Sequence, residues 1–109
     1  MRYIRIAQTN EVPDGTKKKV ELEGKTLLLV NVNGTYFALD NRCPHMGGSL
    51  YDGNLDGDVI TCPRHGASFN VKTGKVQKPA KVAFFSVKVN DATPYPVKLE
   101  DDVILAGIE

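Results

Sequence analysis

The 109-residue chain has few cysteines and histidines, two of each. It also lacks a charge excess: the formal charge of +1 argues against a general nucleic-acid binder, which normally has a strong basic excess. No apolar run approaches the ~20 residues of a transmembrane helix, and the longest is Leu27–Val30. The N-terminal Met1–Arg5 lacks the apolar segment of a signal peptide, so we expect a cytoplasmic protein that does not contact a membrane.

The common catalytic patterns are missing as well. Both histidines lie beside a cysteine, so no nucleophile has a histidine to spare as its base. Asp101-Asp102 is typical of a turn rather than of paired catalytic carboxylates. The glycines at 53 and 57 each follow an aspartate, as in hairpin turns, and form no phosphate-binding loop. The length fits one domain and leaves no room for a flavin domain, so we do not expect an enzyme.

Short apolar or alternating runs, broken by Gly, Asn, Asp and Pro, predict an all-β fold. No segment has a convincing helical period. Asn33-Gly34 is typical of a two-residue type I′ hairpin turn. We place Tyr36, Phe37, Phe84 and Phe85 in the core, and Lys78–Ala80 in a loop. The expected strands span residues 3–7, 18–22, 25–32, 35–39, 58–61, 67–71, 84–89, 95–99 and 103–106.

The few cysteines and histidines form two matched pairs. One residue separates Cys43 from His45, and two residues separate Cys62 from His65. A single zinc ion could use all four groups, and the wider pair has the usual zinc spacing. The tighter pair would have to converge on that ion from almost adjacent positions. A two-iron cluster avoids this difficulty, because the cysteines can bind one iron and the histidines the other.

These segments resemble the Rieske [2Fe–2S] family. The matching stretches are C-P-H-M-G-G-S-L from Cys43, D-V-I-T-C-P-R-H-G-A-S-F-N from Asp58, and T-G-K-V from Thr73. The resemblance implies a small antiparallel β sandwich or barrel, with residues 1–109 as one domain and a cluster-binding subdomain inserted at about residues 41–80. It also implies one [2Fe–2S] cluster per chain, bound by Cys43, His45, Cys62 and His65. The cysteines would bind the buried iron, and the histidines the iron near the surface.

Four other residues distinguish this chain from the respiratory type in that family. Gly48 and Arg64 match two bridged cysteines of the respiratory proteins, so no disulfide is expected here. Ala67 and Phe69 match a serine and a tyrosine whose hydroxyls hydrogen-bond sulfur atoms of the site. Because such hydrogen bonds stabilise the reduced cluster, their absence predicts a low reduction potential.

Within that family the chain resembles the Rieske-type ferredoxins of multicomponent aromatic-ring oxygenases. The resemblance implies a monomeric one-electron carrier between a flavin-dependent ferredoxin reductase and a terminal oxygenase. Partners would dock transiently at the His45/His65 tip, where Met46, Leu50, Pro63 and Pro79 would form an apolar rim or simply shield the cluster. Two alternatives are the small Rieske-like subunit of an assimilatory nitrite reductase and a structural zinc module. The role of residues 90–109 stays open.

Overall fold

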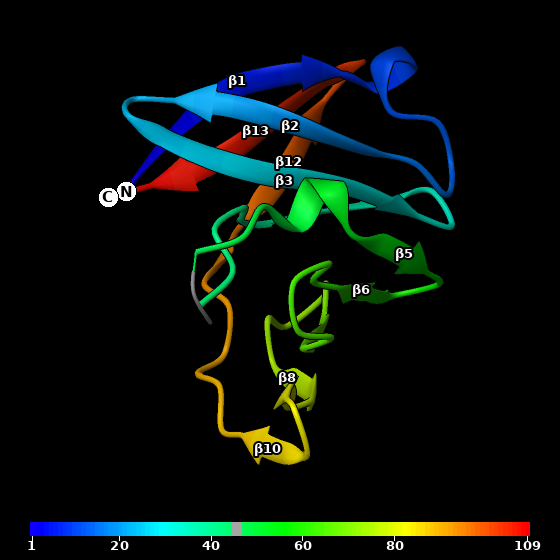
Figure 1. The fold of residues 1–109 in the computed structure, drawn as a ribbon. Helices are drawn as coiled ribbons and strands as arrows, with labels where there is room; N and C mark the ends of the chain where they lie inside the picture. Colours follow the sequence, from blue (N-terminus) through cyan, green and yellow to red (C-terminus); the bar gives the residue numbers. More distant parts are fainter. Residues whose placement is uncertain (45–46) are drawn as a thin grey trace.

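The computed structural model describes residues 1–44 and 47–109 (Figure 1). The described chain is built of β-strands with two short 3-10 turns, η1 (Thr9–Glu11) and η2 (Leu50–Asp52). The predicted all-β, antiparallel class is therefore confirmed. Neither described helix has the length and apolar composition that a membrane span requires.

The strands form three larger sheets and one separate hairpin. The sheets have the strand orders β11-β4-β3-β2, β1-β13-β12 and β5-β6-β7-β8, and the hairpin pairs β9 with β10. The strand bounds are β1 (Arg2–Gln8), β2 (Lys17–Leu22), β3 (Lys25–Val32), β4 (Thr35–Asp40), β5 (Asn54–Asp56), β6 (Val59–Thr61), β7 (Ser68–Asn70), β8 (Val76–Lys78), β9 (Ala80–Val82), β10 (Phe85–Val87), β11 (Pro94–Tyr95), β12 (Val97–Glu100) and β13 (Val103–Ile108).

Strand β3 lies between the larger hydrophobic core and two smaller ones. Its four central residues, 27–30, have no exposed surface. Leu28 and Val30 belong to the core that also contains both cysteines and Phe69, whereas Leu29 packs in a second core with Ile104 of β13. Because successive side chains of a strand point to opposite faces, an unbroken apolar run fits a strand covered on both sides. Each such leucine contributes roughly 1.5–3 kcal/mol by its burial.

The C-terminal strands close the second core. Residues 90–109, whose role the sequence left open, include β12 and β13, and β13 pairs antiparallel with both β1 and β12. Arg2 lies opposite Ile108, so the two chain ends are neighbours (Figure 1). The C-terminal segment thus covers the base of the molecule and does not extend from it.

The predicted turns agree better with the structure than the predicted strand ends. Asn33 and Gly34 have φ values of 54° and 88°, which confirms that both central residues of this hairpin turn are left-handed. The expected strand at 95–99 is divided at Pro96 into β11 and β12, because proline has no backbone N–H for a ladder bond. Strands β5 and β8 lie in stretches that the sequence analysis did not assign to strands.

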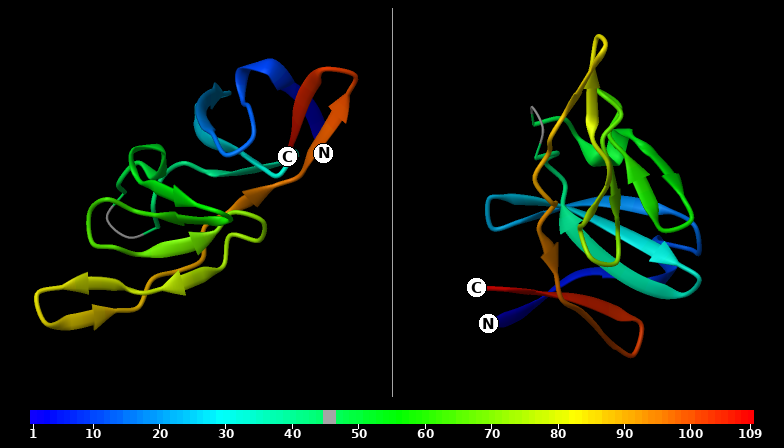
Figure 2. Two further views of the ribbon diagram at one scale, coloured as in Figure 1. Left: turned by 90° about the vertical axis from the view of Figure 1, so that its right-hand side faces the viewer. Right: turned by 90° about the horizontal axis from the view of Figure 1, so that it is seen from below.

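The region of Phe84 and Phe85 differs most from expectation. The predicted strand at 84–89 is shorter, Phe85–Val87, and forms the second arm of the β9–β10 hairpin. Of the predicted loop at 78–80 only Pro79 lies outside a strand, because Lys78 ends β8 and Ala80 begins β9. Phe84 is 100% exposed and Phe85 is 72% exposed, so their assignment to the core was wrong. The physical reason is that, within the described chain, β9 and β10 pair only with each other, and the hairpin projects at the end of the molecule far from the termini (Figure 2). Tyr36 and Phe37 are partly buried; Phe37 packs against the core that contains the cysteines, and Tyr36 against the core of Leu29 and Ile104.

Candidate metal centre

Each cysteine begins a loop that is closed in the same way. The first cysteine loop runs from Cys43, after β4, to Gly48; the second runs from Cys62, after β6, to Ala67. In both loops the cysteine amide donates a hydrogen bond of 2.7 Å to the carbonyl oxygen five residues later, that of Gly48 or of Ala67. Chain segments far apart in sequence thus present the two thiols from equivalent backbone positions.

The residues that flank and bend the loops match as well. Arg42 pairs with Ser49 around the first loop, and Thr61 pairs with Ser68 around the second. A glycine lies four residues after each cysteine, with φ of 70° at position 47 and 75° at position 66. Residues with a side chain rarely adopt this backbone conformation. Glycine therefore lets each loop turn back so that the cysteine amide can form its hydrogen bond with the carbonyl five residues later. A proline after each cysteine fixes φ beside the thiol.

The two loops meet at Gly48. Cys43 is 1% exposed and Cys62 is 2% exposed, and both belong to the larger hydrophobic core. A Cβ atom at position 48 would lie 3.2 Å from the Cys62 sulfur, a tighter contact than most Cβ atoms make. The missing side chain therefore leaves space beside that thiol. No disulfide joins Cys43 and Cys62.

His65 lies at the surface end of the second loop. The residue is partly buried and lines a recess of about 520 Å³ together with Gly66, Pro79, Lys81 and others. Its carbonyl oxygen accepts a hydrogen bond from the Lys81 amide at 2.8 Å, which ties the second loop to β9. This contact was not predicted, although alternating residues at 80–82 and 85–87, separated by two residues, could have indicated a hairpin there.

The predicted ligand set can be compared with the structure for three of its four residues. His45 lies outside the described residues, as does Met46 of the predicted rim. No group of three or more His, Cys, Asp or Glu side chains that could hold one metal ion occurs among the described residues. The four-ligand set of Cys43, His45, Cys62 and His65 therefore stays a prediction.

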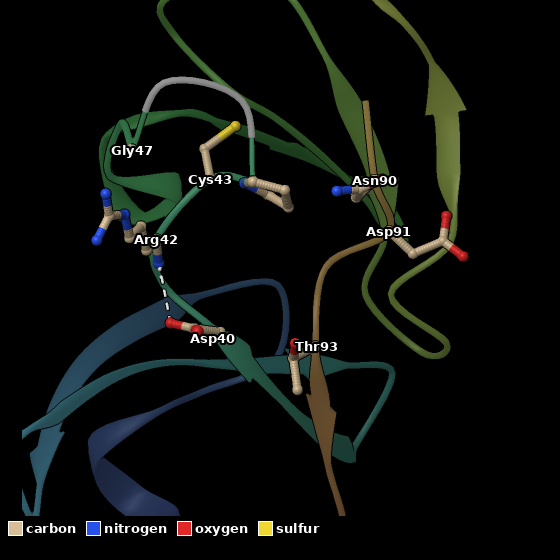
Figure 3. A pocket seen from close by; sticks show the side chains of 8 residues that line it. Asp40, Arg42, Cys43, Gly47, Asn90, Asp91 and Thr93 are labelled. Carbon is tan, nitrogen blue, oxygen red and sulfur yellow. Dashed lines mark hydrogen bonds between the residues drawn. The ribbon is translucent and has the colours of Figure 1, made fainter. Parts of the chain in front are cut away.

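A second recess, of about 570 Å³, lies beside the first cysteine loop (Figure 3). Asp40 and Thr93 line it at one end, and the Cys43 sulfur points away from Asp40. The Arg42 amide donates a hydrogen bond of 3.2 Å to an Asp40 carboxylate oxygen. The Asp40 amide in turn donates one of 2.8 Å to the Thr93 carbonyl, so the segment after β10 supports the start of this loop.

The Asp40 carboxylate also acts on a neighbouring tyrosine. Tyr95 of β11 pairs with Ala38 of β4, and the ammonium group of Lys25 lies 5.7 Å from the centre of its ring. Burial, and secondly the negative charge of Asp40, raise the pKa of Tyr95 above 10.0. Tyr95 therefore keeps its proton at higher pH in the folded chain than in the unfolded one.

The arrangement fits an iron–sulfur cluster on two counts. Cysteine thiolates are soft ligands, and such ligands favour iron–sulfur clusters and zinc over hard cations. The missing Cβ of Gly48 leaves room beside the Cys62 sulfur, and the apolar core around both thiols keeps water away from them.

Comparison with known proteins agrees with this fit. Residues 2–96 match the sequence profile of the Rieske [2Fe-2S] domain. The chain belongs to this family. Its cofactor is a Rieske-type [2Fe–2S] cluster.

The Rieske chain has relatives that match it over almost its full length. It is 34% identical to the ferredoxin component of the naphthalene 1,2-dioxygenase/salicylate 5-hydroxylase systems of a Ralstonia species, over 98% of this chain and 96% of the relative. The solved structure of the Sphingomonas yanoikuyae B1 ferredoxin is 34% identical, with a TM-score of 0.79, over 99% of this chain and 100% of that one. A chain in the complex of reduced oxygenase and oxidized ferredoxin in carbazole 1,9a-dioxygenase is 28% identical, with a TM-score of 0.76, over 95% and 91% of the two chains.

The predicted apolar rim of this Rieske site needs one correction. Leu50 has no exposed surface and packs in the core with the cysteines, because its place in η2 turns its side chain inward. Pro63 and Pro79 are exposed, as a rim requires. The non-ligand residues Ala67 and Phe69 are both buried in the same core, and Arg64 is exposed.

Proposed function

We propose that this chain is a one-electron carrier that takes electrons from a flavin-dependent ferredoxin reductase and passes them to a terminal oxygenase. One observation carries the proposal: the chain is similar, over nearly its full length, to ferredoxin components of aromatic dioxygenase systems. A related ferredoxin forms a complex with its oxygenase. We place this chain in the cytosol as a monomer of one domain.

In this proposal Cys43 and Cys62 hold one iron and His45 and His65 the other, within a cluster-binding region of about residues 41–80. The bound cluster supplies a redox couple that exchanges a single electron. The protein excludes water from the thiols through Leu50, Phe69 and their neighbours in the core. His65, which is partly buried beside an open recess, lies where a partner could approach the cluster.

Purified protein tests the proposal directly. We expect a red-brown protein with two irons per chain, a Rieske-type electron paramagnetic resonance signal after dithionite reduction, and one-electron transfer from a ferredoxin reductase to a ring-hydroxylating oxygenase. Colourless protein with stoichiometric zinc would refute the cluster. If the protein sustains turnover of a nitrite reductase but not of an oxygenase, it is instead the nitrite reductase subunit.

We also propose a reduction potential near the lower end of the Rieske range. Ala67 and Phe69 carry no hydroxyl group that could donate to sulfur, and both are buried beside the cysteines. Because hydrogen bonds to sulfur stabilise the reduced state, Ala67→Ser should raise the midpoint potential measured by voltammetry. A wild-type midpoint well above that of the hydrogen electrode contradicts the proposal.

A further inference from the structure

The charges of the chain are separated along its sequence. Residues 59–90 carry six of the 14 basic side chains and none of the 13 acidic ones, so their formal charge is +6 and that of the rest of the chain is −5. All six are exposed: Arg64, Lys72, Lys75, Lys78, Lys81 and Lys88. The small net charge of the whole protein therefore conceals a basic end that includes the second cysteine loop and the β9–β10 hairpin.

The hairpin at this basic end also exposes apolar side chains. Val82 is 40% exposed, Phe85 is 72% exposed, and Phe84, in the two-residue turn, is 100% exposed. Ala83, the other turn residue, has φ of 56°, a conformation that costs a non-glycine residue about 1–2 kcal/mol. Neighbouring exposed apolar side chains of this size are typical of interaction surfaces.

The hairpin is continuous with the predicted site of electron exchange. The Lys81 amide, in the middle of β9, donates a hydrogen bond of 2.8 Å to the His65 carbonyl. The recess lined by His65 is also lined by Lys81 of β9 and Ser86 of β10, and by Lys78 at the end of β8. A protein that docks on the hairpin therefore lies beside His65.

We propose that the β9–β10 hairpin is a docking arm for a redox partner protein with an acidic face and an apolar recess that accepts Phe84 and Phe85. This inference rests on the electron-carrier function proposed above. Opposite charges steer two proteins together and set their orientation, and aromatic side chains at the centre of an interface supply much of the affinity. An extended polyanion, such as a nucleic acid or an anionic membrane, fits less well because the rest of the chain carries −5.

Titration calorimetry of the cluster-loaded protein with two redox proteins of opposite charge tests the inference. The probes are an oxidised flavodoxin, which is acidic and exposes the apolar edge of its flavin, and ferric cytochrome c, which is basic. We expect flavodoxin to bind at about 20 mM NaCl and to lose about tenfold in affinity at about 300 mM, where charges are screened. Cytochrome c should bind more weakly than flavodoxin at low salt. Tighter binding of cytochrome c overturns the inference.

Matched variants separate the hairpin from the rest of the surface. Lys81→Glu should weaken flavodoxin binding about tenfold, whereas Arg5→Glu, an equal charge change at an exposed residue of β1, should change it less than twofold. Phe84→Ala should weaken binding at least threefold, and Leu99→Ala, at a 48% exposed residue of β12, should not. Equal losses in the hairpin variants and their controls contradict the docking arm.

Two further measurements distinguish the other outcomes. Tighter binding to phosphatidylserine vesicles or to a DNA duplex than to flavodoxin overturns the protein partner in favour of a polyanion. Dithionite reduction, followed by paramagnetic resonance, is measured on the same samples. If the protein is reducible but shows no charge preference, the docking arm is wrong and the electron-carrier function stands; if it holds no reducible cluster, the proposed function is wrong.

Discussion

The two cysteine loops have the same backbone plan but different support. In each, a proline, a left-handed glycine and a serine follow the cysteine by one, four and six positions. The corresponding residues are Pro44 and Pro63, Gly47 and Gly66, and Ser49 and Ser68. The loops differ two positions before the cysteine, where the first has Asn41 and the second Ile60.

That difference decides how each loop is held. The Asn41 side-chain amide donates a hydrogen bond of 2.9 Å to the Ser49 hydroxyl, and its carbonyl oxygen accepts one of 2.8 Å from the Tyr51 amide. Around the second loop, Ile60 is fully buried in the core, and the Ser68 hydroxyl has no hydrogen-bond partner among the described residues. The second loop needs no polar support because it joins two paired strands, β6 and β7, whereas a single isolated bridge flanks the first.

The largest effect should be shared by both loops. Cys43→Ala and Cys62→Ala each remove a thiolate that we propose as an iron ligand, so each should abolish the cluster. Iron content per chain and the visible absorption spectrum measure this loss. Leu99→Ala, on the exposed side of the base, should keep the full iron content. A cysteine variant that retains two irons would show that the two loops do not contribute equally.

A glycine in each loop should separate cluster binding from folding. In Gly48→Ala the new Cβ would lie 3.2 Å from the Cys62 sulfur and 3.2 Å from Cγ of Arg64. The exposed Arg64 side chain can move aside, whereas the Cys62 sulfur, which we propose as an iron ligand, could not do so without leaving its iron. We expect lower iron content and a loss of about 1–3 kcal/mol in unfolding free energy. Gly66→Ala has no atom within 4 Å of its Cβ but has φ of 75°, so it should cost about 1–2 kcal/mol without a comparable loss of iron.

Iron analysis and urea unfolding of both glycine variants check this contrast. If Gly66→Ala loses more iron than Gly48→Ala, backbone conformation rather than the space beside Cys62 governs cluster binding.

The two serines should respond in opposite directions. Ser49→Ala removes the acceptor of the buried Asn41 amide and should destabilise the protein by about 1–3 kcal/mol. Ser68→Ala removes a buried hydroxyl without a described partner, so it should be neutral or stabilising by about 1 kcal/mol. Urea unfolding measures both. A destabilised Ser68→Ala variant would reveal a partner for this hydroxyl in the cluster-loaded protein.

The sequence predicted the parts of the fold that depend on local chemistry. The left-handed pair at Asn33-Gly34 and the apolar run of β3 follow from turn conformation and from strand burial, which neighbouring residues determine. The closure of both cysteine loops could also have been predicted, because the spacing of cysteine, proline and glycine is the same in each.

The parts that it missed depend on which elements meet in space. Phe84 and Phe85 have the pattern of a core strand, and only the missing covering layer in the described fold leaves them exposed. For Leu50 the sequence left an apolar rim and a shielding role both open, and the packing of η2 in the core with the cysteines decides against the rim. The contact between Gly48 and Cys62 joins two loops, and no spacing within one loop can indicate it.

The smallest effect should come from a titration next to the first loop. Burial and the charge of Asp40 raise the pKa of Tyr95 above 10.0, so the folded state retains the phenol proton while the unfolded state loses it. The contribution of Tyr95 to the free energy of unfolding is therefore fully present below pH 10 and declines as the pH rises above that value. Tyr95→Phe should make the loss of unfolding free energy with rising pH less steep, measured by urea unfolding between pH 9 and 11.

Tyr3→Phe, at an exposed tyrosine of β1, is the control for this titration and should leave the alkaline decline unchanged. Asp40→Asn should reduce the decline by part of the Tyr95→Phe effect, because burial, the larger cause of the raised pKa, would remain. If Asp40→Asn instead matches Tyr95→Phe, the carboxylate is the dominant cause. The first loop would then differ from the second not only in its hydrogen bonds. It would also have a carboxylate before it, Asp40, whose charge disfavours the ionisation of Tyr95 at alkaline pH.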